Sequence, residues 1–245
     1  MTKIPKPPIN VLLAQPSNMW PRYDTNFDFI VLHYVGAVST AKNNAEYLHR
    51  EPNLGWSAHF FVDETSIWQS VDFNHAAGHC GVDYSDGKAP FWNGKGTYST
   101  NRRSIGIEMC CKKDKNGNWF IEPETVTRTV ALVKWLMQEF NIPIQNVVRH
   151  YDVCWKTCPE PWVRFPEQWE AFKKRLTEKE EEEEMQRFKS VAELPAYYRD
   201  PVEKLVEMGI IKGRAPDNLD ITEDMVRVAI WFGRMTGVLE TKEEE

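Results

Sequence analysis

The sequence of 245 residues predicts an α/β fold, a central mixed β-sheet flanked by helices, followed by a small helical C-terminal module. Three observations carry this prediction. Short apolar runs typical of buried strands recur along the chain, and they alternate with longer segments of helical periodicity. A run of glutamates separates this region from the C-terminal one. The apolar content of 42% and aromatic content of 12% are sufficient for a folded core.

The strands are expected in four places. Phe29–Leu32 is a short apolar run that indicates a buried strand. Ala58–Asp63 and Ser66–Ser70 flank a turn at Glu64-Thr65 and indicate two neighbouring strands. Ser104–Cys110 is rich in isoleucine and predicts a central strand.

The helices are expected between and after these strands. Ala41–Arg50 is compatible with a helix. The clearest helix is Thr125–Phe140, in which apolar residues recur at spacings of three and four. Trp169, Phe172 and Leu176 follow the same spacing and predict a last helix of the first domain.

The chain is predicted to divide into a domain at 1–176, a charged linker at 177–187 and a module at 188–245. Within the module, Val202–Gly209 predicts a helix stopped by glycine, and a second helix is expected to begin after Thr222 as its N-cap. About 50 residues form only a marginal core. Contacts with the first domain or with a second copy of the chain are therefore two open sources of extra stability.

Charge and hydropathy exclude several partners. The net charge is −6, and from Thr177 onward there are 10 basic and 18 acidic residues, a net of −8, which leaves the first 176 residues at +2. Without a clustered basic face, nucleic acid is not an expected partner. No apolar stretch approaches the roughly 18 residues of a membrane span. The apolar segment Val11–Ala14 is too short for a signal peptide, so we expect synthesis in the cytoplasm and another exit route for any extracellular role.

The five cysteines are Cys80, Cys110, Cys111, Cys154 and Cys158. An odd number of cysteines without a signal peptide does not indicate a disulfide framework. We expect free thiols in the core and one functional thiolate.

Two histidines are positioned where a metal site is expected. His33 closes the apolar run Phe29–Leu32, and His150 follows the apolar segment Val147–Arg149. Cys154 and Cys158 lie four and eight residues after His150, and their spacing alone does not choose between them as a third ligand. Imidazole and thiolate are natural zinc ligands, and three protein ligands leave one position for water, as in catalytic sites.

Hydrolysis at such a metal also requires a group that moves protons and one that stabilises negative charge. Glu108 is a candidate for the first role because it interrupts an otherwise apolar strand, where a carboxylate is costly unless it faces a site. A strand-edge carboxylate in water is the alternative. Lys156 is a candidate for the second role, and a solvated loop lysine is its alternative.

Seven segments in order resemble the type 2 N-acetylmuramoyl-L-alanine amidases, a superfamily of phage endolysins, bacterial autolysins and peptidoglycan recognition proteins. The resemblance covers roughly residues 20–175. The segments are Ile30–Tyr34, Thr40–Ala45, Ser57–Asp63, Ala77–Gly81, Asn101–Cys110, Val148–Asp152 and Lys156–Pro159.

The resemblance implies a role for each matching residue. It implies a zinc ion, and it selects the cysteine before proline as the third ligand, so that the ligands are His33, His150 and Cys158. Glu108 matches the catalytic carboxylate of the family. Lys156 matches the lysine that the family carries two residues before the ligand cysteine. The implied fold is a mixed sheet flanked by helices, with zinc at the floor of a groove.

The same resemblance implies contacts with substrate. His79 falls in the family's Trp-His-x-Gly region near the groove, although Gly78 stands where tryptophan is usual. Tyr34, Trp92 and Tyr98 are candidates to line the groove, and packing in the core is the alternative for these aromatic residues.

Two further positions bear on catalysis. Some relatives carry a catalytic tyrosine just before the histidine that matches His59, where this chain has Ala58, so Glu108 is expected to act without it. Non-catalytic recognition proteins of the superfamily typically lack the ligand cysteine, so the presence of Cys158 favours an enzyme.

The expected function is therefore zinc-dependent hydrolysis of the amide between N-acetylmuramic acid and L-alanine in peptidoglycan. A non-catalytic peptidoglycan-binding module is the alternative, and a structural zinc in an unrelated regulator is a third reading. A phage or prophage endolysin that leaves through a holin pore is favoured over a cytoplasmic wall-recycling amidase. Asp200–Gly213 resembles one copy of an S-layer-homology-type helix pair, which leaves cell-wall binding, homo-oligomerisation and simple packing open for the C-terminal module.

Overall fold

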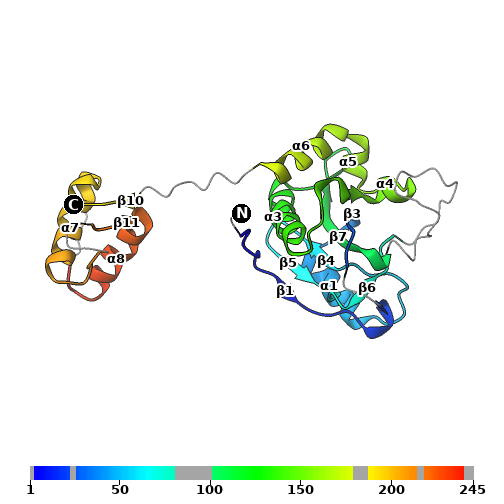
Figure 1. The fold of residues 1–245 in the computed structure, drawn as a ribbon, viewed down its shortest axis with the longest axis horizontal. Helices are drawn as coiled ribbons and strands as arrows, with labels where there is room; N and C mark the ends of the chain where they lie inside the picture. Colours follow the sequence, from blue (N-terminus) through cyan, green and yellow to red (C-terminus); the bar gives the residue numbers. More distant parts are fainter. Residues whose placement is uncertain (1–2, 23–25, 81–100, 179–186, 214–217, 240–245) are drawn as a thin grey trace. The chain divides into compact units, whose positions relative to one another are not determined.

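The computed structural model describes the chain except for residues 1–2, 23–25, 81–100, 179–186, 214–217 and 240–245 (Figure 1). Trp92 and Tyr98 therefore lie outside the described residues. The chain forms two compact units, Met1–Glu178 and Lys179–Glu245, and each is described by itself.

The first unit is built on one mixed β-sheet, which confirms the predicted α/β class. Its strands pair in parallel except for β4 with β5 and β7 with β8. The order across the sheet is β1 (Asn10–Val11), β5 (Ile67–Gln69), β4 (Phe60–Val62), β7 (Ser104–Lys113), β3 (Phe29–Val38) and β9 (Val147–Arg149), with β8 (Trp119–Phe120) beside the end of β7. A separate two-stranded sheet joins β2 (Met19–Pro21) to β6 (His75–Ala77).

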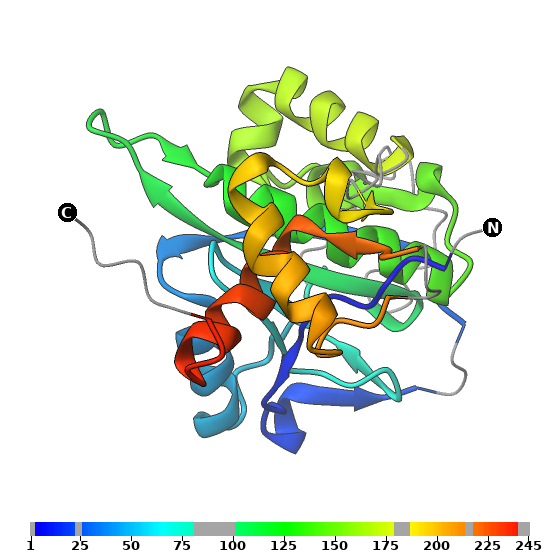
Figure 2. The same cartoon turned by 90° about the vertical axis from the view of Figure 1, so that its left-hand side faces the viewer.

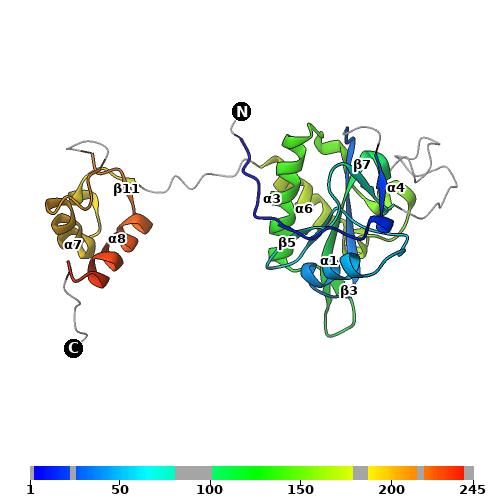
Figure 3. The same cartoon turned by 90° about the horizontal axis from the view of Figure 1, so that it is seen from below.

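Helices cover both faces of this sheet. The helices α3 (Pro123–Glu139) and α6 (Pro166–Thr177) pack against each other (Figure 3), and their apolar residues share one core cluster with the sheet. The opposite face packs against α1 (Ala41–Arg50), whose residues Ala41 and Leu48 contact Phe61 and Cys110 in a second cluster. Two short helices, α4 (His150–Cys154) and α5 (Glu160–Arg164), follow β9.

Strand alternation decides which side chains face the α1 side. Successive side chains of a strand point to opposite faces of a sheet. In β7, Ile105, Ile107 and Met109 belong to the α3 core, whereas Cys110 packs on the α1 side. The even-numbered residues of β7, including Glu108, therefore share the α1 side.

The strand containing His33 is longer than the sequence predicted. The apolar run Phe29–Leu32 is only its first part, because β3 continues to Val38 and His33 lies inside it. The continuation is half-polar, so it carried no apolar signal, and the strand is irregular between Tyr34 and Val38 around Gly36, which has a φ of +67°. At His33 the strand pairs with Glu108 of β7, whereas its pairing with β9 ends at Leu32.

The second unit contains two helices, α7 (Ala196–Glu207) and α8 (Glu223–Met235), which lie side by side (Figure 2). A short antiparallel ladder joins β10 (Arg187–Phe188) to β11 (Ile221–Thr222). The Thr222 hydroxyl accepts a hydrogen bond from the Met225 amide at 3.3 Å, so the residue expected to cap α8 does so. No helix within the described residues is long and apolar enough to cross a bilayer.

A buried carboxylate ties α1 to the turn between β4 and β5. Asp63 accepts five hydrogen bonds, from the amide of Ala41 and from the amides and hydroxyls of Thr65 and Ser66. Burial raises the pKa of Asp63, but these hydrogen bonds outweigh it and hold the pKa below its ordinary value. The ionised carboxylate is thus part of the folded state.

We predict that Asp63→Asn lowers the free energy of unfolding by about 2 kcal/mol, because the amide cannot accept all of these bonds. Because the folded pKa is depressed, the contribution of Asp63 is present above about pH 4, the unfolded pKa, and is lost as the pH falls through the folded one. Thermal unfolding of both proteins between pH 7 and pH 3 checks this. The difference in melting temperature should shrink in acid, and a difference that grows would contradict the prediction.

Candidate active site

The floor of the candidate site is set by the pairing of β3 with β7. His33 lies directly opposite Glu108 in the parallel register of the two strands. Both residues come from the α1 side of the sheet, and His33 is buried. Neighbouring strands run about 4.8 Å apart, so this register fixes an imidazole beside a carboxyl group.

His150 reaches the site from the neighbouring strand. The strand β9 ends at Arg149 and α4 begins at His150, so the histidine lies where the chain turns from strand to helix. Asp152 stabilises this turn, since its carboxylate accepts the Arg149 amide at 2.8 Å and the Arg149 guanidinium at 2.8 Å. The rings of His33 and His150 are 4.5 Å apart between centroids.

Cys158 is brought back to the same place by the loop after α4. The Tyr151 amide donates to the Cys158 carbonyl at 2.8 Å, which folds the loop onto the start of α4. The Cys158–Pro159 peptide bond is cis. The Cys158 sulfur lies 3.7 Å from Nδ1 of His33. Burial raises the pKa of this thiol, so a neighbouring cation is needed to hold it as thiolate.

The ligand atoms of His33, His150 and Cys158 lie within 4.8 Å of one another. Two ligands of a tetrahedral zinc, one nitrogen and one sulfur, are about 3.6 Å apart at ordinary bond lengths, close to the observed separation. Cys154, the rival of Cys158 by spacing, instead packs in an apolar cluster with Val31 and Val153. The geometry therefore favours Cys158, the residue that the family resemblance selected.

The electrostatics of the histidines fit a metal. Burial lowers the pKa of His33, helped by the charges of His150, His79 and Lys156, and burial and Lys156 lower that of His150 to about 3. Both imidazoles are thus neutral, the form that binds a metal. Within the described part of the chain, both ring nitrogens of His150 are buried without a hydrogen-bond partner. An unsatisfied buried nitrogen is costly, and a bound cation would satisfy it.

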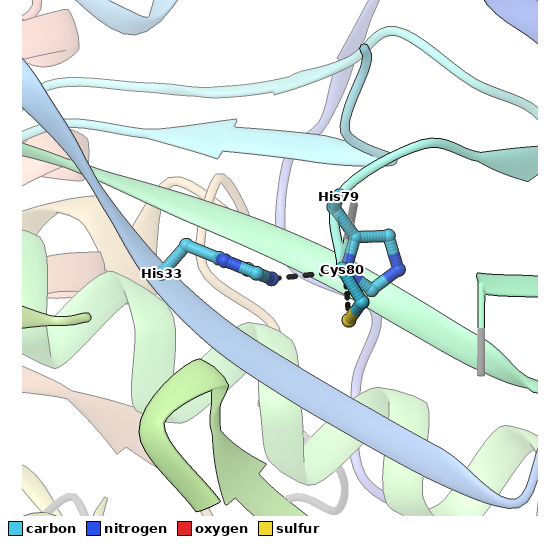
Figure 4. Close-up of side chains that lie close together, drawn as sticks. All are labelled: His33, His79 and Cys80. Carbon is cyan, nitrogen blue, oxygen red and sulfur yellow. Dashed lines mark hydrogen bonds between the residues drawn. The ribbon is translucent and has the colours of Figure 1, made fainter. Parts of the chain in front are cut away.

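A second group of potential ligands shares His33 and was not predicted: His33, His79 and Cys80 (Figure 4). Nε2 of His33 lies 2.9 Å from Nδ1 of His79, and that nitrogen lies 3.2 Å from the Cys80 sulfur. These separations are shorter than about 3.3 Å and 3.6 Å, the distances between ligands of a tetrahedral zinc. They are typical of hydrogen bonds instead.

Glu108 and Lys156 lie beside the first group. Glu108 is half-buried, and its Oε2 is a buried atom without a hydrogen-bond partner among the residues described. Burial raises the pKa of Glu108 to about 8, and the charge of Lys156 acts in the opposite direction. Lys156 is exposed, and its charge lowers the pKa of both His33 and His150, so its ammonium lies near the two histidines. A carboxyl group with a pKa near neutrality can both accept and donate a proton.

Tyr34 lies at the edge of the site, half-buried. Its hydroxyl donates to Glu160 at 3.1 Å, and its ring packs edge-on against Trp119. Burial and the bond to Glu160 raise the pKa of Tyr34. Tyr34 directly follows His33 in the sequence, and its hydroxyl is held in an internal hydrogen bond to Glu160.

The positions that depart from the family pattern have local explanations. A side chain at Gly78 would lie 2.6 Å from the ring of Trp20, so the indole of β2 fills the space beside that glycine. Ala58 is fully buried and belongs to the apolar cluster that contains Ala41 and Leu48 of α1. His59 is structural: its Nδ1 accepts the Gly106 amide at 3.0 Å, and burial lowers its pKa to about 3.

The fold and this arrangement of two histidines, a cysteine and a carboxylate define the class of a metallo-hydrolase. Residues 23–161 match the family described as N-acetylmuramoyl-L-alanine amidase, and the chain belongs to that family.

Named relatives and a solved structure agree. The chain is 31% identical over 153 residues to the N-acetylmuramoyl-L-alanine amidase BlyA of Bacillus subtilis (strain 168), covering 61% of this chain and 41% of that protein. It is 34% identical over 162 residues to XlyA of the same organism, covering 64% and 46%. The structure of the catalytic domain of XlyA superposes with a TM-score of 0.54 at 29% identity, covering 69% of this chain and 99% of that domain. The chain thus spans less than half the length of these two curated relatives.

We predict that Asp152→Ala lowers the free energy of unfolding by about 1–2 kcal/mol, because it removes the cap that begins α4 at His150. Glu46→Ala is the matched control, since it removes only an exposed pair with Lys42 at 3.6 Å and should cost under about 0.5 kcal/mol. Denaturant unfolding of the two variants measures both values. Equal stability of the two variants would show that the cap does not hold this turn.

Proposed function

We propose that the protein is a zinc-dependent peptidoglycan hydrolase that cleaves the amide bond between N-acetylmuramic acid and the L-alanine of the stem peptide. The observation that carries the proposal is the convergence of His33, His150 and Cys158 beside Glu108. The membership of the amidase family supports the same reaction. Zinc is proposed because two imidazoles and a thiolate are a donor set that it prefers.

Each residue has a defined part in this reaction. A zinc ion held by the three ligands would supply Lewis acidity that polarises the amide carbonyl and acidifies water. Glu108 in its ionised form takes a proton from the attacking water and delivers it to the leaving amine as the C–N bond breaks. The Lys156 ammonium stabilises the negative charge that develops on the carbonyl oxygen. The products are a carboxylate on the muramic acid side and a free amine on L-alanine.

Contacts with substrate are part of the proposal. His79 and Tyr34 are proposed to contact the substrate, as the family resemblance implies. We further propose that the chain acts as a phage or prophage endolysin, since a solved structure that matches the fold is titled a mutant endolysin from Bacillus subtilis. A peptidoglycan-binding module without activity is the alternative, and the pairing of Glu108 with a complete ligand set favours the enzyme over it.

We predict that the purified protein with zinc releases stem peptides from peptidoglycan and exposes new N-terminal alanine, and that chelation stops release until zinc is restored. Glu108→Gln should lower the rate about 10²–10⁴-fold, because the amide cannot accept the proton. Cys158→Ser should lose zinc and activity. Amine release from purified walls and zinc content per chain are the two measurements.

Cys154→Ala is the matched control, because it removes a neighbouring buried thiol of the apolar cluster. It should retain zinc. Stoichiometric zinc without release on any wall preparation would support the binding module, and full activity of the Glu108→Gln and Cys158→Ser variants would exclude the proposed mechanism.

The second unit is proposed to bind cell-wall polymer. A groove of about 750 Å³ lies within this unit, lined by Tyr197 and Trp231, which are 67% and 61% exposed. Three cations, Lys204, Arg227 and Arg234, and one acid, Asp200, also line it, and Arg227 pairs with Glu223 at 2.7 Å. Exposed aromatic rings in a concave site suit the faces of sugars, and guanidinium groups suit carboxylates and phosphates. The groove therefore supports an anionic glycan as ligand, in agreement with the resemblance to an S-layer-homology-type module.

We predict that the Tyr197→Ala, Trp231→Ala double variant binds purified walls at least about tenfold more weakly, since tenfold corresponds to about 1.4 kcal/mol. Co-sedimentation of the full chain with walls, in a Glu108→Gln background that prevents digestion, measures this. Phe232→Ala is the matched control because Phe232 is 55% exposed on the same helix and does not line the groove. Unchanged wall binding together with loss of a dimer would instead assign the surface to homo-oligomerisation.

A further inference from the structure

The His79 side chain lies buried over a gap in β7. A side chain at Gly106 would lie 2.5 Å from Cγ of His79, so only a glycine leaves room for this imidazole. The hydroxyl of Ser104, two residues earlier on the same face of β7, lies 3.1 Å from Nε2 of His79. His79 is thus fixed from below by the strand that also carries Glu108.

The other nitrogen of His79 contacts a proposed metal ligand. Nδ1 of His79 lies 2.9 Å from Nε2 of His33, and the two rings meet edge-on with an interplanar angle of 88° (Figure 4). Nδ1 of His33 is the nitrogen that lies 3.7 Å from the Cys158 sulfur. Ser104, His79 and His33 therefore form a continuous chain that ends at the ligand atom.

A neutral imidazole carries one proton and one lone pair, so the chain has a direction. If Nδ1 of His33 is to bind a metal, its Nε2 must carry the proton and donate it to Nδ1 of His79. That nitrogen must then accept, so the proton of His79 is on Nε2 and is donated to the Ser104 hydroxyl. In the reverse direction, Nδ1 of His33 would be protonated and unable to bind.

Cys80 is a second neighbour of this nitrogen. Its buried sulfur lies 3.2 Å from the same Nδ1 of His79. A thiol is both a weak donor and a weak acceptor, so this contact is satisfied in either direction of the chain. The direction is therefore set by a metal at His33, which requires an unprotonated Nδ1.

We propose that His79 is a positioning residue that holds His33 in the tautomer able to bind metal through Nδ1. This inference rests on the proposed zinc site and adds to it a group that orients a ligand without binding the metal. Loss of such a hydrogen-bond partner typically lowers metal affinity 10–100-fold. This role is additional to the contact with substrate that is proposed for His79 above.

The test measures zinc affinity of the full chain by competition with a chelator of known affinity. His79→Leu should weaken zinc binding 10–100-fold. His79→Asn should recover part of the loss, because its Oδ1 can take the place of Nδ1 as acceptor. Ser104→Ala keeps the ring and removes the hydroxyl beside its Nε2, so it should weaken zinc binding less than His79→Leu and tests the proposal even if His79→Leu does not fold. His49→Gln is the control, since the ring of this exposed histidine bonds only to the Leu13 carbonyl among the described residues, and the variant should bind zinc like the parent.

Cobalt substitution adds a spectroscopic measurement. The thiolate-to-cobalt absorption should persist in His79→Leu and Cys80→Ser and disappear in Cys158→Ser. Loss of the band in Cys80→Ser would overturn the proposal, because His79 and Cys80 would then be ligands themselves. The proposal would be overturned if folded His79→Leu bound zinc with the affinity of the parent. It would also be overturned if the two separate variants Ser104→Ala and His79→Asn both did so. Either result would leave the proposed function intact. Failure of the parent chain to bind zinc would overturn both.

Discussion

The parallel pairing of β3 with β7 is the constraint on which the site depends. It places His33 opposite Glu108 at the spacing of neighbouring strands, before any loop contributes. The same strand β3 pairs on its other side with β9, so that His150 arrives one residue after the last paired position, Leu32 with Arg149. The three proposed ligands and the carboxyl group of Glu108 are thus assembled around two strand pairings, and the loop carrying Cys158 folds back onto them.

Within β7, successive side chains point to opposite faces of the sheet, and the two faces have different roles. Ile105, Ile107 and Met109 fill the core under α3, where any polar atom would be costly. On the other face, Ser104 holds His79, Gly106 leaves the space that its ring occupies, and Glu108 faces the ligands. A five-residue segment, Ser104–Glu108, therefore builds the core with every second residue and the site with the others. A one-residue shift of register would exchange the two sets.

The sequence predicted the features that depend on residues close to one another along the chain. Apolar runs and helical periodicity predicted β3, β4, β5 and β7 and the helices α1, α3 and α6 of the first unit, and Thr222 was correctly expected to cap α8. The short elements β1, β2, β6, β8, α4 and α5 were not predicted, because two to five residues show no period. Spacing could not separate Cys154 from Cys158, because both cysteines are buried and only the fold of the loop after α4 decides which one reaches His33. The family resemblance carried that information because it encodes the fold. The contact of His79 with His33 joins residues 46 positions apart, and no periodicity within one segment reports it.

The two ligand groups that share His33 cannot both bind a metal through it. One group faces Nδ1 and the other faces Nε2, and a neutral imidazole has a single lone pair, so binding at one nitrogen requires the proton on the other. The separations distinguish the two groups. The 3.7 Å between Nδ1 of His33 and the Cys158 sulfur fits two ligands of one ion. The 2.9 Å between Nε2 of His33 and Nδ1 of His79 fits a hydrogen bond. The unsatisfied nitrogens of His150 lie on the first side. Both neighbours of the His33 ring thus favour the tautomer with its proton on Nε2: His79 accepts that proton, and the proposed ligand partners lie at Nδ1.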